Sequence, residues 1–428
     1  MAGGWHHWTM TLATPPASAI AATPSADLRV EVAVVGAGPV GGLVAALLAG
    51  AGLSVAVIEA AAPETLCRPA SDGRAIAVAL SAKRALAAAG LWEVMAPAAE
   101  PILDIRVTDG ASPLFLHYDH TQVGDEPLGW IVENEIIKAA SLARLRVLHG
   151  VTLLAPARVA EWRYGAGGAE AVLADGRRVR AALVVAADGR ASPTRAAAGI
   201  GVDRWDYRQS GIVCAIAHQH PHEGVAHEHF LPAGPFAILP MTNNRSGIVW
   251  TETSAAAPAI VAQSEADFLG ELGARVGGFL GDIALASPRF SYPLSLQMAR
   301  RITAPRLALV GDAAHGMHPI AGQGLNIGIR DAAALAEAVV DTRRLGLDPG
   351  GPAVLERYGR WRRFDTLLML AATDGLNRLF SNAIPPVRLA RDLGLAAVNR
   401  LPAVKRHFMR HAMGLVGDLP RVLRGETL

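Results

Sequence analysis

This chain of 428 residues contains few cysteines and carries little net charge. There are 2 cysteines, and the formal net charge at pH 7 is +2. The two thiols, Cys67 and Cys214, form neither a disulfide framework nor a metal-ligand spacing. We therefore expect a reducing compartment, with both thiols buried as small hydrophobic side chains. Because so small a net charge gives little attraction to phosphates, nucleic acid is not expected as a partner.

Membrane-spanning and targeting segments are missing as well. The sequence has no uninterrupted apolar run long enough to cross a bilayer. Residues 1–27 are rich in Ala, Pro, Thr and Ser, and they lack the basic start and the apolar core of a secretory signal. We expect this segment to be a disordered extension, the fold to begin at Leu28, and the protein to be cytoplasmic.

The most informative feature that is present is a glycine-rich loop between an apolar strand and an alanine-rich helix. The strand is expected at 306–310, and the loop and helix start contain Gly311, Asp312, His315, His318, Pro319, Gly322, Gly324, Leu325 and Asn326. Glycines let backbone amides approach a ligand closely, and the first turn of a helix stabilises negative charge. Asp312 follows the strand directly and is placed to accept hydrogen bonds from sugar-like hydroxyls. The pattern favours a loop that holds a flat, anionic cofactor, with the two histidines hydrogen-bonding the loop together.

A second cofactor motif lies near the start of the chain. An expected strand at 28–35 leads into Gly36-Ala37-Gly38-Pro39-Val40-Gly41, a small-residue helix at 42–49 and a strand at 53–58 that ends in Glu59. In a dinucleotide fingerprint the first glycine makes the turn, the second admits the pyrophosphate, the third lets helix and strand pack, and the acid binds ribose hydroxyls. No arginine stands beside Glu59, which favours an unphosphorylated ribose and leaves FAD and NAD as alternatives.

A third acid follows an apolar strand in the middle of the chain. The run 182–187 ends in Asp188, so that Glu59, Asp188 and Asp312 all stand at the end of apolar strands. One extended dinucleotide that lies across several strand ends needs such a set. Asp175-Gly176, by contrast, predicts a hairpin turn between two strands.

The sequence predicts an α/β fold, in which a Rossmann-like cofactor domain carries an inserted, mainly antiparallel β-sheet domain and is followed by C-terminal helices. Short β-like runs are expected at 102–108, 114–120, 210–217, 225–231, 236–240 and 246–251, with a helix at 265–277. The predicted cofactor domain comprises 28–100, 129–200 and 300–345, the substrate domain 101–128 and 201–299, and the helical region 346–428. The catalytic cavity is expected between the inserted sheet and the cofactor.

Histidines gather in the inserted domain, at His218, His220, His222, His227 and His229. Side chains two residues apart share one face of a strand, so that pairs of them are able to chelate a metal. No carboxylate stands at a clear ligand spacing, and solvent-facing strand positions explain the histidines equally well. We therefore expect no metal.

The C-terminal segment 357–428 is basic, with 13 Lys and Arg against 5 Asp and Glu. The runs 366–380 and 403–416 predict amphipathic helices with basic faces. Such helices either pack on the core as a solvated cap or rest on an anionic bilayer, from which a hydrophobic substrate enters. Packing is the favoured interpretation, and one helix pair is able to do both.

Three of these motifs together resemble a known family. The segments GAGPVG at 36–41, ADGRASPTR at 187–195 and GDAAHGMHPIAGQGLNIGIRD at 311–331 are similar to those of the aromatic-ring flavoprotein monooxygenases, which bind FAD in one Rossmann domain. Within that family the chain resembles the hydroxylases of ubiquinone biosynthesis, whose pattern is echoed at 72–77 (DGRAIA), 130–134 (WIVEN) and 358–365 (YGRWRRFD). The similarity extends from about residue 30 to the C-terminus.

The resemblance implies a role for each matching residue. The implied FAD contacts are Gly36, Gly38 and Gly41 at the pyrophosphate, with Pro39 beside them, Glu59 at the adenosine ribose, Arg74 at a phosphate, Asp312 with Gly311 at the ribityl chain, and Pro319, Gly322, Gly324, Leu325 and Asn326 along the isoalloxazine edge. Asn134 and Asp188 are also expected to contact the cofactor, Asp188 near the path of the nicotinamide donor. No catalytic side chain is identified beyond two candidates at the flavin edge, Pro319 and His318.

The implied reaction is hydroxylation of the aromatic ring of a polyprenylated phenol in ubiquinone biosynthesis. NADH or NADPH reduces FAD, oxygen adds to give a flavin hydroperoxide, and the phenol ring attacks its distal oxygen. The implied partners are that hydrophobic phenol, a quinone-biosynthesis complex, and the inner face of the membrane through the C-terminal region. Two alternatives stay open: an FAD-dependent reductase or dehydrogenase of a polyprenyl or aromatic substrate, and a non-catalytic flavin-binding member of a quinone-biosynthesis complex.

Overall fold

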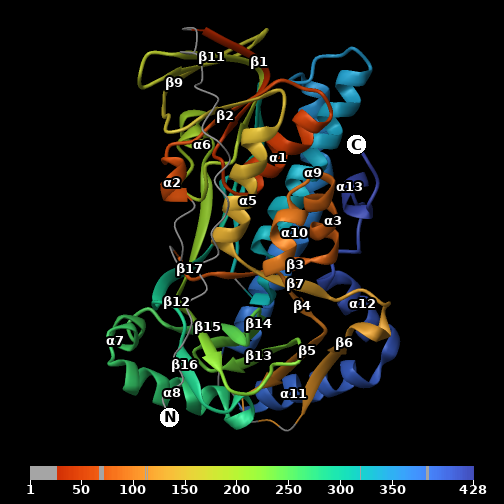
Figure 1. Cartoon of the computed structure of the whole chain (residues 1–428). Coiled ribbons are helices and arrows are strands. Elements are labelled where there is room, and N and C mark those ends of the chain that lie inside the picture. The colour runs from red at the N-terminus through yellow and green to blue at the C-terminus, as the bar shows by residue number, and fades with distance from the viewer. Residues whose placement is uncertain (1–26, 67–71, 111, 113, 319, 382–384) are drawn as a thin grey trace.

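Two large β-sheets occupy opposite ends of the molecule in the computed structural model (Figure 1). The structure describes residues 27–66, 72–110, 112, 114–318, 320–381 and 385–428. One sheet is built mainly from the strands of the two glycine-rich motifs, and the other from the middle of the chain. The α/β fold with a second, mainly antiparallel sheet is therefore confirmed. Residues 1–26, which belong to the predicted extension, lie outside the described residues.

The first sheet has a parallel centre, in the order β18-β19-β11-β1-β2-β8, with β9 and β10 attached through β11. Its strands are β1 (Asp27–Val35), β2 (Val55–Ile58), β8 (Val151–Leu154), β9 (Val159–Gly165), β10 (Gly168–Leu173), β11 (Arg178–Ala186), β18 (Thr303–Ala304) and β19 (Leu307–Leu309). The central strands are apolar on both faces because other elements cover them on both sides. The hairpin turn predicted at Asp175-Gly176 is confirmed, since β10 and β11 pair antiparallel on either side of it.

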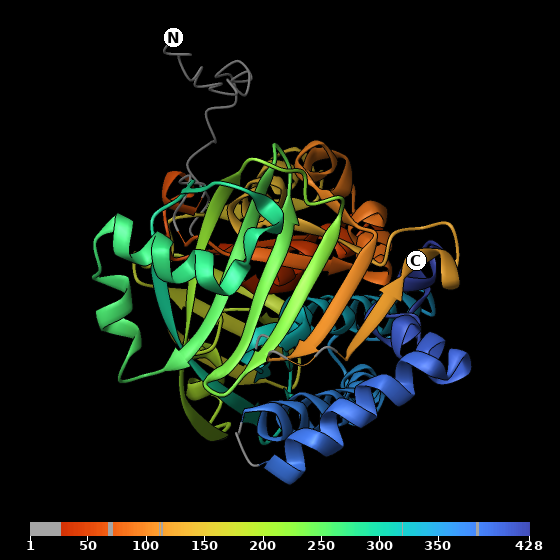
Figure 2. The ribbon, with the colours of Figure 1, turned by 90° about the horizontal axis from the view of Figure 1, so that it is seen from below.

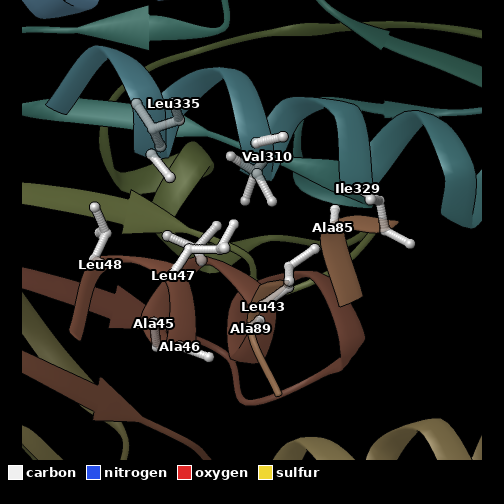
Figure 3. Close-up of a cluster of buried hydrophobic side chains, with 14 of the residues drawn as sticks. Leu43, Ala45, Ala46, Leu47, Leu48, Ala85, Ala89, Val310, Ile329 and Leu335 are labelled. Carbon is white, nitrogen blue, oxygen red and sulfur yellow. The ribbon is translucent and has the colours of Figure 1, made fainter. Parts of the chain in front are cut away.

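Helix α1 (Pro39–Gly50) contacts β1 and β2 and lies between α5 (Asn134–Val147) and the long helix α9 (Gln323–Arg344). It contains no charged or polar side chain, so it is suited to a position that is covered all round. Figure 3 shows Leu43 and Leu47 of α1 among side chains of α9, with Val310 from the end of β19 close by. This packing holds the first turns of α1 and α9 at the same edge of the parallel sheet.

The second sheet follows the order β20-β17-β12-β15-β14-β13-β5-β6, with β16 paired to β12. Its strands are β5 (Asp104–Asp109), β6 (Phe115–Asp119), β12 (Val202–His218), β13 (Val225–Leu231), β14 (Gly234–Met241), β15 (Arg245–Thr253), β16 (Ile283–Leu285), β17 (Phe290–Ala299) and β20 (His315–Gly316). Helices α7 (Ala257–Val261) and α8 (Glu265–Val276) lie over one face, as Figure 2 shows. Phe268 and Leu272 of α8 pack there against Phe236 and Trp250 of the strands.

The other face of this sheet meets a small three-stranded sheet and the C-terminal helices. The small sheet has the order β3-β7-β4, from β3 (Ala75–Ala79), β7 (Gly129–Glu133) and β4 (Glu100–Ile102). The remaining helices are α2 (Pro63–Leu66), α3 (Leu80–Ala88), α4 (Trp92–Met95), α6 (Pro193–Ala197), α10 (Pro352–Phe380), α11 (Pro385–Arg400), α12 (Pro402–Ala412) and α13 (Arg421–Arg424). Helix α10 contacts α9 and β14, and α11 contacts β5 and β6, so the C-terminal region joins the two halves.

Several local predictions were wrong in detail. Asp27, which was assigned to the extension, is the first residue of β1 and pairs with Arg178. Ile102 belongs to β4, because it pairs with Gly129 of the small sheet, and the second sheet begins only at Asp104. The second sheet is mainly antiparallel, as predicted, with one parallel pair, β13 and β5. Among the described helices, none has both the length and the apolar character that crossing a bilayer requires.

Candidate cofactor and substrate site

A cavity of about 1040 Å³ lies between the two sheets and brings most of the predicted site residues together. Those that line it are Gly38, Pro39, Arg74, Asn134, Gly311, Asp312, Gly322, Gly324, Leu325 and Asn326. Gly36, Gly41, Glu59, Asp188 and His318 do not line it, and Pro319 lies outside the described residues. The two glycine-rich motifs therefore open on one space, although almost 300 residues separate them in the chain.

Of the three glycines at the start of α1, two are enclosed by backbone and one faces open space. A Cβ on Gly36, where φ is +101°, would lie 2.4 Å from the carbonyl oxygen of Ala187, and a Cβ on Gly41 would lie 2.0 Å from that of Gly36. Both positions are thus closed by backbone. Around Gly38 nothing lies within 4 Å of a Cβ position, and this residue faces the cavity. The first turn of α1 is therefore bare where a pyrophosphate would approach.

Glu59 follows β2 and stands beside this turn. Its carboxylate accepts hydrogen bonds from the backbone N–H of Ala37 and of Ala61, both at 2.8 Å. These bonds fix the carboxylate beside the turn before α1, which is the place of the ribose-binding acid in a dinucleotide fold. The ribose role stays a prediction.

The first turn of α9 forms a further wall of the cavity. Gly322 precedes the helix in a left-handed conformation, with φ +61°, and Gly324 has no atom within 4 Å of a Cβ position. Asn326 is buried, and its side chain accepts from the N–H of Ala79 and donates to the carbonyl of Ala77. Because both amide atoms of Asn326 are engaged by β3, its role in this structure is to hold α9 against the small sheet. The loop leaves the helix start open to the cavity.

A cluster of polar groups around Asp72 lies beside this wall. Asp72 accepts hydrogen bonds from Arg74 at 2.8 Å, from Asn134 at 2.7 Å and from Lys138 at 2.9 Å. Burial alone would raise the pKa of Asp72, but Arg74 and Lys138 outweigh it and hold this pKa well below its usual range. The Tyr292 hydroxyl donates to the backbone oxygen of Asp72 and so ties the cluster to β17. Arg74, Asn134 and Lys138 line the cavity, so this cluster presents positive charge to it.

Asp312 and Arg190 bring opposite charges to the same region. Asp312 is exposed and lines the cavity, at the carboxyl end of β19. Arg190 donates to the hydroxyl and the carbonyl oxygen of Ser295, and a Cβ on Gly316 would lie 2.4 Å from its guanidinium. Burial lowers the pKa of Arg190, and the charge of Asp312 acts in the opposite direction.

Asp188 and His318 are placed differently from what their cofactor roles require. The carboxylate of Asp188 accepts from the hydroxyl of Ser192 and, at 2.9 Å, from the N–H of Thr194, so it is used in the turn that starts α6. The His318 ring accepts from the N–H of Ile320 at 3.3 Å, within its own loop, and packs edge-on against Tyr207, with ring centroids 5.3 Å apart. Burial lowers the pKa of His318 to about 4, so the ring is neutral at pH 7. A proton-transfer role for His318 gains no support.

A buried charge network under the glycine-rich loop was not predicted. Asp331 of α9 accepts from the N–H of Gly311 at 3.0 Å, and it pairs with His315 at 2.6 Å and with Arg362 of α10 at 2.7 Å. Burial alone would raise the pKa of Asp331, but His315 and Arg362 hold it below its usual range. Asp365 joins the network through Arg362 at 2.5 Å. All members of this network lie in the segments 311–331 and 358–365. Both segments match the pattern of one family, and this shared match was the signal that could have indicated the network.

Three of the histidines in the inserted domain, His218, His220 and His222, bond backbone carbonyls, whereas His229 bonds the hydroxyl of Thr108 and His227 lines the cavity. His218 bonds the carbonyl of His220 at 2.7 Å, and His222 bonds the carbonyl of Met241 at 2.9 Å. Within the described part of the chain, no three of His, Cys, Asp or Glu come together as a metal site. Cys214 is buried, and burial raises the pKa of its thiol to about 12; Cys67 lies outside the described residues.

Beyond the cofactor residues the cavity continues as an apolar compartment between the second sheet and the C-terminal helices. It is lined there by Val107, Leu116, Phe230, Leu376, Phe380 and Leu395, among others. The rings of Phe230 and Phe380 stack with centroids 4.0 Å apart. Behind them, Arg391 of α11 makes a buried ion pair with Asp109 of β5 at 2.8 Å, which attaches α11 to the sheet. The space is therefore polar at one end and apolar at the other.

Comparisons with known proteins agree with this arrangement. The FAD binding domain family matches residues 29–363. The chain is 52% identical over 417 residues to the ubiquinone hydroxylase UbiL of Rhodospirillum rubrum, covering 97% of both chains. It is 34% identical to the 3-demethoxyubiquinol 3-hydroxylase of Escherichia coli, covering 90% of this chain and 98% of that one. The crystal structure of p-nitrophenol 4-monooxygenase PnpA from Pseudomonas putida superposes with a TM-score of 0.76 at 23% identity, covering 91% of this chain and 99% of that one, which shows a common fold.

Proposed function

The chain belongs to the FAD binding domain family and, within it, to the ubiquinone hydroxylases, and on this premise we propose that it hydroxylates the aromatic ring of a polyprenylated phenol in ubiquinone biosynthesis. It is an FAD-dependent monooxygenase that uses a nicotinamide donor and O2.

One observation carries the substrate class: the cavity joins a polar end, lined by the two glycine-rich motifs, to an apolar end under α10 and α11. A polyprenylated phenol has the same division, with a polar ring and an apolar tail. The ring is therefore assigned to the part of the cavity next to the cofactor. The tail is assigned to the compartment around Leu116, Phe230 and Phe380, where its burial is favoured by about 0.8 kcal/mol per CH₂.

The residues present fit FAD. Gly38 and Gly324 leave open space at the first turns of α1 and α9, where backbone N–H groups and the helix dipoles favour anionic groups. We assign the pyrophosphate to Gly38 with Arg74 nearby, the adenosine ribose to Glu59, the ribityl chain to Asp312, and the ring edge to Gly322, Gly324 and Leu325. When bound, FAD supplies the redox chemistry that activates oxygen.

The protein's own contribution is positioning and the exclusion of water. The Asp331 network fixes α9 and the Gly311 loop, and Asn326 fixes α9 against β3, so the open helix start cannot shift freely. The apolar walls of the substrate compartment keep water away from the reacting ring. No serine, cysteine or metal constellation is needed for this reaction.

The proposal is tested with purified, FAD-loaded protein, a prenylated phenol and ¹⁸O₂. We expect oxidation of NADH or NADPH that depends on the phenol, and one labelled oxygen in the ring of the product. Reduction of the phenol or its tail without labelled oxygen would favour a reductase. Tight FAD binding without turnover on any phenol would favour a non-catalytic role in a quinone-biosynthesis complex.

We also propose that the C-terminal helices rest on an anionic membrane surface. The side chain of Phe364 on α10 is 75% exposed, and Leu367, Leu368 and Leu379 on the same helix are exposed too. On α12, Val404 and Phe408 are exposed. Exposed arginines accompany them at Arg360, Arg363, Arg406 and Arg410. Apolar side chains with flanking basic groups are the pattern of helices that lie in the bilayer interface.

Sedimentation with vesicles tests this surface. We expect binding to vesicles that contain anionic phosphatidylglycerol, weaker binding to neutral phosphatidylcholine, and loss of binding in the double variant Phe364→Glu and Phe408→Glu. The control is Val147→Glu, which places the same charge at an exposed position on α5, away from these helices. Equal binding of the double variant and the control would contradict the proposal.

A further inference from the structure

Glu228 of β13 presents a carboxylate to the cavity, beside its apolar compartment. Side chains alternate along a strand, so Ala226, Glu228 and Phe230 share one face, and all three line the cavity. The strand neighbours of Glu228 are Val107 on β5 and Ala237 on β14, and they line it too. The carboxylate is thus bounded by apolar side chains on its own strand and on both neighbouring strands.

No partner for this carboxylate exists among the described residues. Asp206 and Asp312, the other carboxylates that line the cavity, lie towards its polar end, where the cationic groups are. Asp109, on β5, is closed off by its ion pair with Arg391. Glu228 is half-buried, and a carboxylate that has only apolar side chains around it costs free energy, so its presence suggests that a ligand supplies the missing hydrogen bond.

The other groups around Glu228 leave its protonation to burial alone. His227, which also lines the cavity, is neutral at pH 7 because burial lowers its pKa to about 4. Tyr118 of β6 is neutral, since burial raises its pKa to about 12. The face of β14 that lines the cavity presents Pro235, Ala237 and Leu239, and α10 contributes Leu376 and Phe380, none of which titrates. Burial raises the pKa of Glu228 to about 7. The side chain is therefore able to exchange a proton near neutral pH.

The strand pairing places Glu228 between the cofactor end and the tail end. A row of paired residues crosses the sheet as Val213, Val249, Ala237 and Glu228, and each lines the cavity. Val213 packs close to Gly73, next to Arg74. With about 4.8 Å between neighbouring strands, β13 lies about 14 Å from β12. The small side chains of Val249 and Ala237 leave room between these strands for an aromatic ring.

We infer that Glu228 binds the hydroxyl group of the phenol substrate and accepts its proton; this inference rests on the proposed function. The phenol O–H bond breaks, its electron pair stays on the phenol oxygen, and a new O–H bond forms on the carboxylate. The ring becomes more electron-rich and reacts more readily with the activated oxygen. The proton returns to solvent after turnover, and no further oxidant or reductant is needed.

Kinetics of Glu228→Gln and Glu228→Asp test the proton transfer. In the wild type, kcat for ring hydroxylation is expected to rise with pH up to about 7, as the carboxylate ionises, and then to level off. Glu228→Gln is expected to retain FAD and its reduction by the nicotinamide donor, to lose roughly 100-fold in hydroxylation, and to lose the inflection near pH 7. Glu228→Asp should restore part of the rate and the inflection. Glu265→Gln, an exposed position on α8, is the matched control.

A binding measurement separates this inference from the proposed function. Equilibrium dialysis compares a prenylated phenol with its methyl ether, which lacks the proton that Glu228 accepts. The wild type is expected to prefer the phenol at least tenfold, and Glu228→Leu to lose that preference. If the wild type shows the preference but never hydroxylates, the proposed function fails and the phenol-binding role of Glu228 stands. A Glu228→Gln variant with the wild-type rate and pH profile, or a Glu228→Leu variant with the wild-type preference, would overturn the inference.

Discussion

Two acids near opposite ends of the cavity, Asp331 and Glu228, have opposite surroundings. Asp331, under the cofactor loop, is enclosed by His315, Arg362 and the N–H of Gly311, and its pKa is held below the usual range. Glu228, in the substrate compartment, has apolar neighbours, and its pKa is raised to about 7. A fully paired acid fixes a structure, whereas an unpaired one is available to a ligand. The cofactor end is thus rigidly built, and the substrate end keeps its polar group for chemistry.

The largest effect on stability is expected when Asp331 loses its ion pair with Arg362. Arg362→Met removes the arginine that pairs with the buried Asp331 and leaves only His315 and the N–H of Gly311 beside this carboxylate, so we expect the free energy of unfolding to fall by about 3–5 kcal/mol. Denaturant unfolding of the FAD-loaded protein measures it, with the exposed neighbour Arg363→Met as a control close to wild type. If Arg362→Met loses no more stability than Arg363→Met, the ion pair of Asp331 does not stabilise the fold, and the contrast with Glu228 is contradicted.

The same pair predicts a pH dependence. The pKa of Asp331 is lower in the folded than in the unfolded protein, so its contribution to stability is present above the ordinary carboxyl pKa and is lost as the pH falls through the folded value. We therefore expect wild type to lose more stability than Arg362→Met on acidification.

At the cofactor end, Asp312→Ala tests the ribityl contact. Loss of hydrogen bonds to a carboxylate costs about 1.5–3 kcal/mol, so FAD should bind roughly 10- to 100-fold more weakly. The flavin spectrum of the purified protein and a titration with FAD measure this. Asp125→Ala, at an exposed site, is the control. A normal yellow spectrum and unchanged affinity would contradict the assignment of Asp312.

Gly324→Val tests the open start of α9. Because no atom lies within 4 Å of a Cβ at Gly324, and valine is a better helix former than glycine, the variant should fold with unchanged stability. Its side chain would occupy the space assigned to the flavin edge, so we expect FAD affinity and turnover to fall by about tenfold or more. Gly270→Val on α8, also in open space, serves as the control. Unchanged turnover would remove this contact from the account.

The smallest effect is expected at the apolar end, with Leu116→Trp. Leu116 is buried on β6 and lines the tail compartment, so a larger side chain shortens it. Overpacking of this kind costs about 1–3 kcal/mol, and we expect KM to rise about tenfold for a long-tailed phenol. KM for a phenol without a tail should not change. An equal rise for both substrates would place the tail elsewhere.

The sequence predicted the cofactor end far better than the substrate end, for a physical reason. A phosphate-binding turn imposes glycines at fixed spacing, because Gly36 and Gly41 must pack against backbone and Gly38 must leave room for a ligand. An apolar compartment accepts many side chains, so nothing in the sequence singled out Leu116 or Glu228. Glu228 stands in an ordinary strand, and only the pairing of β13 with β5 and β14 shows that its neighbours are apolar.

Asp188 is a residue at the cofactor end whose motif alone did not indicate its contacts. Its place after β11 suggested a cofactor contact, but the structure engages its carboxylate with Ser192 and Thr194. An acid at a strand end serves either a ligand or the next turn, and the serine four residues later was the signal for the second role. Its contact with FAD stays a prediction.

The central claim is that one cavity holds FAD at its polar end and a prenylated phenol along the second sheet. A crystal structure of the protein with FAD and a prenylated phenol tests it most directly. We expect FAD across the first turns of α1 and α9, the phenol hydroxyl within hydrogen-bond distance of Glu228, and the tail between β6 and α11. A phenol ring bound away from β13, or a tail that leaves the cavity before reaching Phe230, would contradict it.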